Sequence, residues 1–230
     1  KLLSQNGWVC GVSLFDCQLF MRKCKKNIGI ILPEYENPDD YLAFFERFYK
    51  DYEVLDKYSP VSSYVGLLCV GNRAFPIPED IPLALSQSKK TDIPVLGIGW
   101  GMEMLNLAYG GKHELQKNIR GVTQNPVNTK HRVFLSPGGK VSFIIGGSGW
   151  VTVSANNKSG IPNHLLASDF FVSAYSQDRT AQAIEKPGHN WVIGVQWPLC
   201  ELSDLPSGFD NLLIAFIERS TGVTVVENIE

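Results

Sequence analysis

The chain has 230 residues, of which 44% are hydrophobic and 19% charged, and its formal net charge at pH 7 is −2. This composition is typical of a globular protein with one large domain or two small ones. The charged residues form no basic stripe, so we expect no nucleic-acid partner. No apolar run is long enough for a transmembrane helix, and the first residues do not follow a secretory signal pattern, so we expect no membrane partner.

The five cysteines are Cys10, Cys17, Cys24, Cys69 and Cys200. An odd number in a chain this long does not indicate a disulfide framework, so we expect a reducing, cytoplasmic setting. The first three recur every seven residues, but no Cys-x-x-Cys pair or nearby His accompanies them. We therefore expect half-buried thiols, no metal site and no cofactor.

The first half of the chain alternates strands and helices. Residues 1–26 carry short apolar runs and are expected to form an N-terminal extension whose role the sequence leaves open. Four strands are then predicted, at 27–32, 53–55, 64–70 and 93–98. Helices are predicted around Tyr41, Phe44, Phe45 and Phe48, with Asp39 and Asp40 as candidate caps, and at 81–90 and 102–109.

The second half is richer in strands. They are predicted at 132–135, 140–145, 150–154, 170–175, 180–185 and 191–196, with Gly and Pro turn signals between them. A helix at 210–219 closes the domain, and its inner face carries Leu212, Leu213, Phe216 and Ile217. The whole pattern predicts an α/β fold, with a mostly parallel central sheet flanked by helices and additional antiparallel strands in the second half. The domain is expected to span 27–220, followed by a C-terminal tail at 221–230.

Residues 94–106 are the most informative segment. They predict a buried strand, a tight glycine turn and then a helix, which is the shape of a nucleophile elbow. In such an elbow a Ser or Cys is held at the tip of the turn, where this chain has Gly99.

Three segments resemble the class I glutamine amidotransferase superfamily, and most of all its branch of gamma-glutamyl hydrolases and gamma-glutamyl-GABA hydrolases. Gly97–Glu103 is similar to the family's Gly-Ile-Cys-x-Gly-Met-Gln, and Asn106–Gly111 to its Asn-x-Ala-x-Gly-Gly. Gly194–Trp197 is similar to the start of its Gly-Val-Gln-Trp-His-Pro-Glu. The resemblance implies a flavodoxin-like amidotransferase fold over most of the chain.

The catalytic positions of this family are changed here. The family's Cys nucleophile falls on Gly99 and its His on Pro198, while its Glu falls on Cys200, or on Glu201 if one residue is inserted. Its oxyanion loop falls on Gly71-Asn72. A segment that often carries His in the gamma-glutamyl branch, 153–158, has none. We therefore expect no catalytic residues at the degenerate positions.

The leading hypothesis is an inactive amidotransferase-like domain that binds a small gamma-glutamyl-like or amide ligand, or a protein partner. The candidate ligand-binding residues are Gly71, Asn72, Arg73, Gly99, Trp100, Asn156 and Asn157. Each also has a structural interpretation, because Trp100 could pack in the core and Asn157 could turn the chain.

Two alternatives stay open. The chain could be a gamma-glutamyl or amide hydrolase with a relocated nucleophile such as Cys200 or Cys69, although no motif places any of its four histidines as the base. His131 and His189 precede predicted strands, which favours ordinary surface or packing roles for them. The chain could also be an assembly module in which residues 1–26 make the contacts.

Overall fold

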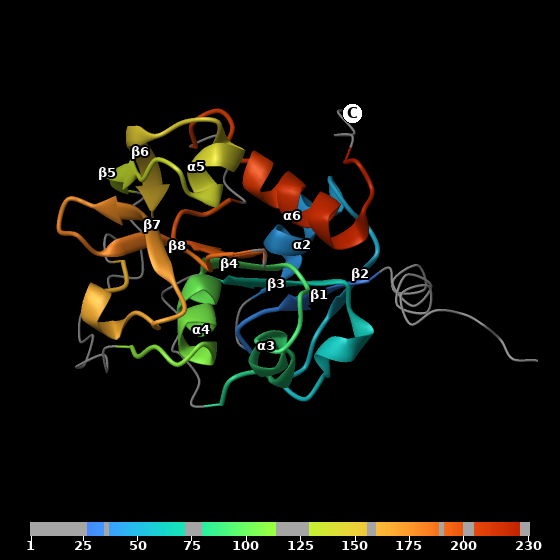
Figure 1. Ribbon diagram of the computed structural model, residues 1–230. Coiled ribbons are helices and arrows are strands. Elements are labelled where there is room, and N and C mark those ends of the chain that lie inside the picture. Colours follow the sequence, from blue (N-terminus) through green and yellow to red (C-terminus); the bar gives the residue numbers. More distant parts are fainter. Residues whose placement is uncertain are drawn as a thin grey trace, which may run out of the picture.

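The computed structural model describes residues 27–34, 37–71, 80–113, 129–155, 160–188, 191–199 and 205–225. These residues form one mixed nine-stranded sheet with helices on both faces (Figure 1). Several sequence predictions lie outside the described residues: those for the segment 1–26, Asn72, Arg73, Asn156, Asn157, Cys200 and Glu201.

The first part of the sheet is parallel. Its strands are β2 (Tyr52–Val54), β1 (Ile28–Ile31), β3 (Gly66–Gly71), β4 (Val95–Gly99) and β9 (Val192–Val195), in this spatial order. All residues of β1, β3, β4 and β9 are buried, as expected for parallel strands covered on both faces. The strands predicted for this half are confirmed, with shifts of up to two residues at their ends.

The second part is antiparallel. It continues from β9 through β8 (Ala181–Glu185), β7 (Phe171–Ser176) and β5 (Thr129–Leu135) to β6 (Gly149–Ala155). The predicted α/β class and the antiparallel strands of the second half are therefore confirmed.

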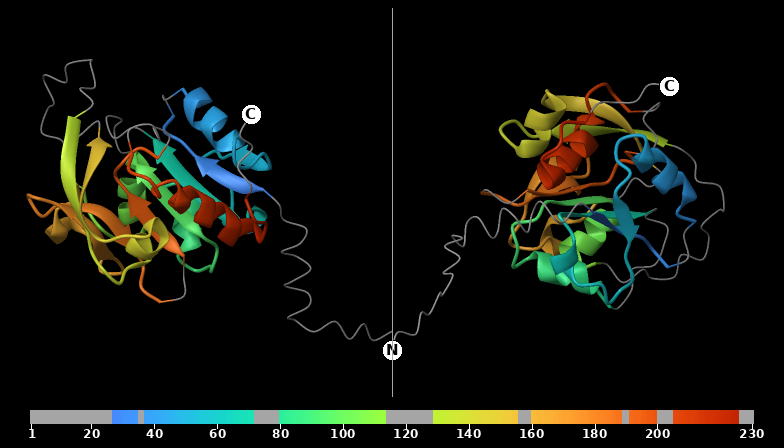
Figure 2. Two further views of the ribbon diagram at one scale, coloured as in Figure 1. Left: turned by 90° about the horizontal axis from the view of Figure 1, so that it is seen from above. Right: turned by 90° about the vertical axis from the view of Figure 1, so that its right-hand side faces the viewer.

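Helices cover both faces of the sheet (Figures 1 and 2). The helices α2 (Asp39–Glu46), α5 (Lys140–Ile145) and α6 (Asn211–Thr221) share one apolar core. On the other face, α3 (Leu83–Ser88) and α4 (Trp100–Ala108) share a second core. No helix in the described part of the chain has the length and apolarity needed to cross a membrane.

The prediction that Asp39 or Asp40 caps α2 is wrong, because the helix begins one residue earlier than this requires. Its N-cap is Pro38, which makes no side-chain hydrogen bond to the helix, and Asp39 and Asp40 lie in the first turn instead. Acidic side chains there still interact favourably with the positive end of the helix dipole.

The strand predicted at 140–145 is wrong, because these residues form α5. Val141, Ser142 and Ile145 face the core, while Phe143 is 87% exposed. The side chain of Glu185 in β8 accepts hydrogen bonds from the backbone N–H groups of Lys140 (2.8 Å) and Val141 (3.0 Å). These two bonds cap the start of the helix from a strand that lies far along the chain.

Candidate binding site at the carboxyl edge of the parallel strands

The predicted elbow is present. Gly99 is the last residue of β4, and α4 begins at the next residue, Trp100. Gly99 has φ 59° and ψ −113°, a conformation that residues with a side chain rarely adopt. A Cβ atom added at Gly99 would lie 2.6 Å from the carbonyl oxygen of Gly71. The backbone of the elbow is therefore intact, but no side chain fits at its tip unless the end of β3 moves.

Glycines also allow α4 to approach the sheet closely. A Cβ at Gly101 would lie 1.8 Å from the carbonyl oxygen of Cys69, and one at Gly97 would lie 2.7 Å from the carbonyl oxygen of Gly101. Both contacts are with backbone, which cannot move aside as a flexible side chain can. The position of the elbow helix thus depends on glycine at both positions.

The register of the strands brings three residues together at one edge. Gly71 pairs with Gly99 across β3 and β4. Ile98 pairs with Val195 across β4 and β9, so the next residue, Gln196, follows on beside Gly99. Such an edge, at the carboxyl ends of parallel strands, is where α/β folds bind ligands.

Gln196 is a buried amide at this edge. Its side chain is 8% exposed, and its Nε2 has no hydrogen-bond partner among the residues described. A buried polar group without a partner costs free energy, so we take this donor as a candidate for contact with a ligand. A ligand oxygen is the natural acceptor for this donor.

Further buried polar side chains continue from Gln196 across the antiparallel strands. The Gln196 backbone N–H donates to the carbonyl oxygen of Gln182 (2.9 Å). Gln182 is itself buried, and its Oε1 lies 3.4 Å from Nε2 of His131 in β5. Its Nε2 donates to Oγ of Ser176 (3.4 Å). We call Gln196, Gln182, His131 and Ser176 the polar row.

No sequence motif predicts the polar row as one site. The sequence favours a surface or packing role for His131 and gives no role to the two glutamine side chains. The sequence does contain a signal for these residues, because each is a polar residue at or near the end of a strand. Combining these residues into one site requires the strand order, which no motif in the sequence reveals.

The surroundings of Trp100, a candidate ligand contact, and of Pro198, a degenerate catalytic position, favour structural roles. Trp100 is 2% exposed and belongs to the apolar core under α3 and α4, which favours the packing interpretation. Pro198 stands half-buried at the position of the family's His, and its side chain can neither donate nor accept a proton.

Cys69 lies in the middle of β3 and is completely buried. Burial raises the pKa of its thiol well above the ordinary value, because the thiolate loses its hydration. Within the described ranges, no hydrogen bond to this thiol is found. A nucleophilic cysteine needs a stabilised thiolate, so these surroundings argue against Cys69 as a relocated nucleophile.

Comparison with known proteins assigns the chain to a known group. Residues 79–198 match the family model described as Peptidase C26. A Mycobacterium tuberculosis protein named "Putative glutamine amidotransferase" is 32% identical over 136 residues, which are 56% of this chain and 41% of that protein. The match therefore spans about two fifths of the length of this curated relative.

Two solved structures show the same fold. A "putative GMP synthase" protein from Thermoplasma acidophilum is 17% identical with a TM-score of 0.61, covering 86% of this chain and 95% of that one. The glutaminase domain of Trypanosoma brucei CTPS with bound acivicin is 13% identical with a TM-score of 0.62, covering 88% and 96%. At these identities the likeness concerns the fold alone.

Proposed function

Because this chain belongs to the peptidase C26 family of class I glutamine amidotransferase-like proteins, we propose that it keeps the family fold as a binding domain and has lost the family's thiol chemistry. The observation that carries the proposal is the paired loss at Gly99 and Pro198. Amide cleavage in this family needs a nucleophile and a base, and neither a hydrogen atom nor a proline ring can supply one. We also propose that the chain derives from the gamma-glutamyl hydrolase branch of the family, which its sequence resembles most.

The ligand that we propose is a small molecule with an amide or gamma-glutamyl group. The amide of Gln196, whose register position is beside Gly99, offers a donor to a carbonyl or carboxylate oxygen and is buried. The side chain of Gln182, the next member of the polar row, can both donate and accept a hydrogen bond.

The test combines binding with turnover. Glutamine and a panel of gamma-glutamyl amides are titrated by isothermal calorimetry, and the same mixtures are assayed for ammonia and free glutamate. We expect binding of at least one compound without turnover. Gln196→Leu removes the donor at similar volume and is expected to weaken binding by about tenfold, the value of one buried hydrogen bond.

Gln87→Leu is the matched control, because Gln87 is a half-buried glutamine of α3 outside the polar row and is expected to leave this binding unchanged. Clear release of ammonia or glutamate by the wild-type chain would overturn the proposal. If that release then disappeared in Cys200→Ser, the relocated-nucleophile alternative would hold instead.

A further inference from the structure

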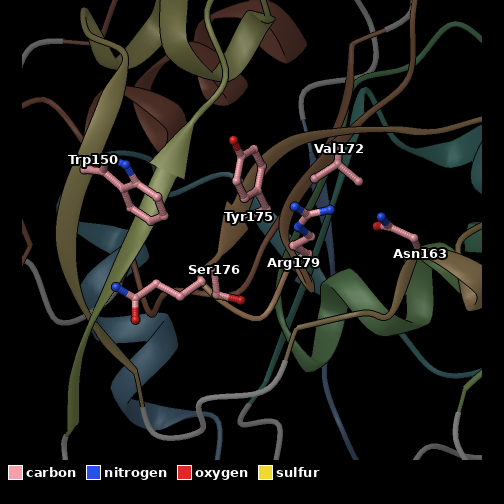
Figure 3. A pocket seen from close by; sticks show the side chains of 7 residues that line it. Trp150, Asn163, Val172, Tyr175, Ser176 and Arg179 are labelled. Carbon is pink, nitrogen blue, oxygen red and sulfur yellow. The ribbon is translucent and has the colours of Figure 1, made fainter.

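A cavity lies on the antiparallel part of the sheet. It has a volume of about 470 Å³, and its walls include Trp150 of β6, Val172 and Tyr175 of β7, Asn163 and Arg179 (Figure 3). Its lining also includes Gln177, as well as Ser176 of the polar row, but no residue of β4, of α4 or of the elbow. A cavity of this size matches a ligand of drug or nucleotide size.

Two aromatic rings form a corner of this cavity. The ring centroids of Trp150 and Tyr175 are 6.3 Å apart and their planes meet at 80°. Phe134 of β5 contacts both, with centroids at 5.4 Å from Trp150 and 5.2 Å from Tyr175. These contacts follow from the register, because Phe134 pairs with Trp150 on one side and with Tyr175 on the other.

The corner is rigid and open to solvent. Trp150 is 44% exposed although it packs against two other aromatic rings. A ring held in this way offers a stacking surface that needs no ordering when a ligand binds. A flat molecule can lie against one ring and present its edge to the other.

Arg179 adds a positive charge to the same cavity. It has φ 65° and is the sole non-glycine residue with positive φ in the part of the chain that the structure describes. Its guanidinium makes no hydrogen bond or ion pair with a described residue. Figure 3 shows this side chain beside Tyr175 and Val172. A strained backbone that places a free charge in a cavity is a feature associated with binding sites.

The neighbouring carboxylate does not neutralise this charge by direct contact. Asp178 accepts hydrogen bonds within its own hairpin, from the Oγ of Ser176, from the backbone N–H of Thr180 (3.0 Å) and from its Oγ1 (2.8 Å). A second cation, Arg132, lies with its Cζ 5.1 Å from the centroid of the Trp150 ring. The charges near the aromatic corner therefore favour an anion.

We propose that this cavity binds a small planar aromatic molecule with a negatively charged group, with its ring against Trp150 and Tyr175 and its charge against Arg179. The Asn163 amide offers a hydrogen bond to a polar atom on the ring. An aromatic carboxylate and a nucleoside monophosphate share this chemistry, and both serve as probes.

The experiment is a calorimetric titration with indole-3-carboxylate and with AMP. Their uncharged counterparts, indole-3-carboxamide and adenosine, and inorganic phosphate, which lacks a ring, are titrated in parallel. We expect one of the two charged aromatic probes to bind more tightly than its counterpart and than phosphate. Which of the two binds distinguishes a carboxylate from a phosphate source.

Two variants test the assignment of residues. Arg179→Gly relieves the positive φ, so the protein is expected to stay folded. It is expected to lower the affinity for the charged probe about tenfold or more and to leave the affinity for the neutral probe unchanged. Trp150→Ala is expected to lower the affinity for both the charged and the neutral aromatic probe. Phe143→Ala, which removes an exposed aromatic ring outside the cavity, is the matched control and is expected to change neither.

Three results would overturn the proposal. The first is that neither charged probe binds at millimolar concentration, and the second is that Arg179→Gly leaves the affinity for the charged probe unchanged. The third is that Phe143→Ala lowers this affinity as much as Trp150→Ala does. Because Ser176 belongs both to the polar row and to the lining of this cavity, the probes are also titrated against Gln196→Leu, which is expected to leave their affinity unchanged. A loss of affinity in that variant would overturn the assignment of the probes to this cavity.

Discussion

Gly99 shows most directly why the elbow tolerates no side chain. Its backbone angles are ones that residues with a side chain rarely adopt, and a Cβ would press on the carbonyl oxygen of Gly71. We predict that Gly99→Ala lowers the free energy of unfolding by about 1–3 kcal/mol, the usual cost of a residue in a sparsely populated backbone region. Urea denaturation followed by circular dichroism measures this change.

Gly110, two residues after the end of α4, separates the backbone penalty from the steric contact with Gly71. It has φ 94°, but a Cβ there would meet no atom within 4 Å. Gly110→Ala therefore carries only the backbone penalty, and we expect it to destabilise less than Gly99→Ala. Equal losses would mean that contact with Gly71 contributes nothing at the elbow.

At the scale of elements, α5 depends on one distant carboxylate. Glu185 is almost completely buried and satisfies two N–H groups of the first turn. We predict that Glu185→Ala lowers the free energy of unfolding by about 2–4 kcal/mol, since two hydrogen bonds to a charged group are lost and two donors are left unsatisfied. Glu185→Gln retains an acceptor and is expected to lose less.

Asp56 provides the control for this prediction. It also accepts two hydrogen bonds, from the backbone of Tyr58 (2.8 Å) and the hydroxyl of Ser59 (2.9 Å), but on the surface. Asp56→Ala is expected to cost much less, because water replaces the lost carboxylate there. Both variants are compared by denaturation, and an equal cost would contradict the capping role of Glu185.

The same helix explains where prediction from sequence stops. The run Lys140–Ile145 contains β-branched and aromatic residues, which favour a strand, whereas its first turn is capped by the side chain of Glu185 from 45 residues away. Buried parallel strands and the glycine elbow were predictable, because runs of apolar residues and glycine spacing are local signals. The polar row was not, since it depends on the strand order.

For the whole molecule, the central fact is that one continuous sheet separates two apolar cores. Cys69 lies inside it, paired with Ile31 of β1 and with Gly97 of β4. The backbone of Gly101 at the start of α4 covers its carbonyl oxygen. To expose this thiol, β3 must separate from both neighbouring strands, which we expect only when the whole sheet unfolds.

Thiol labelling measures this directly in a variant with serine at positions 10, 17, 24 and 200. We predict that Cys69 does not react with a disulfide reagent in native buffer, and that its labelling follows the denaturation curve seen by circular dichroism. The reason is that only an exposed, ionised thiol attacks the reagent, and burial raises the pKa of this one. The same variant in strong denaturant should label at once, which confirms that the thiol is intact. Rapid labelling of the native protein would instead reveal a local opening at β3 and would make Cys69 available as a nucleophile near the elbow.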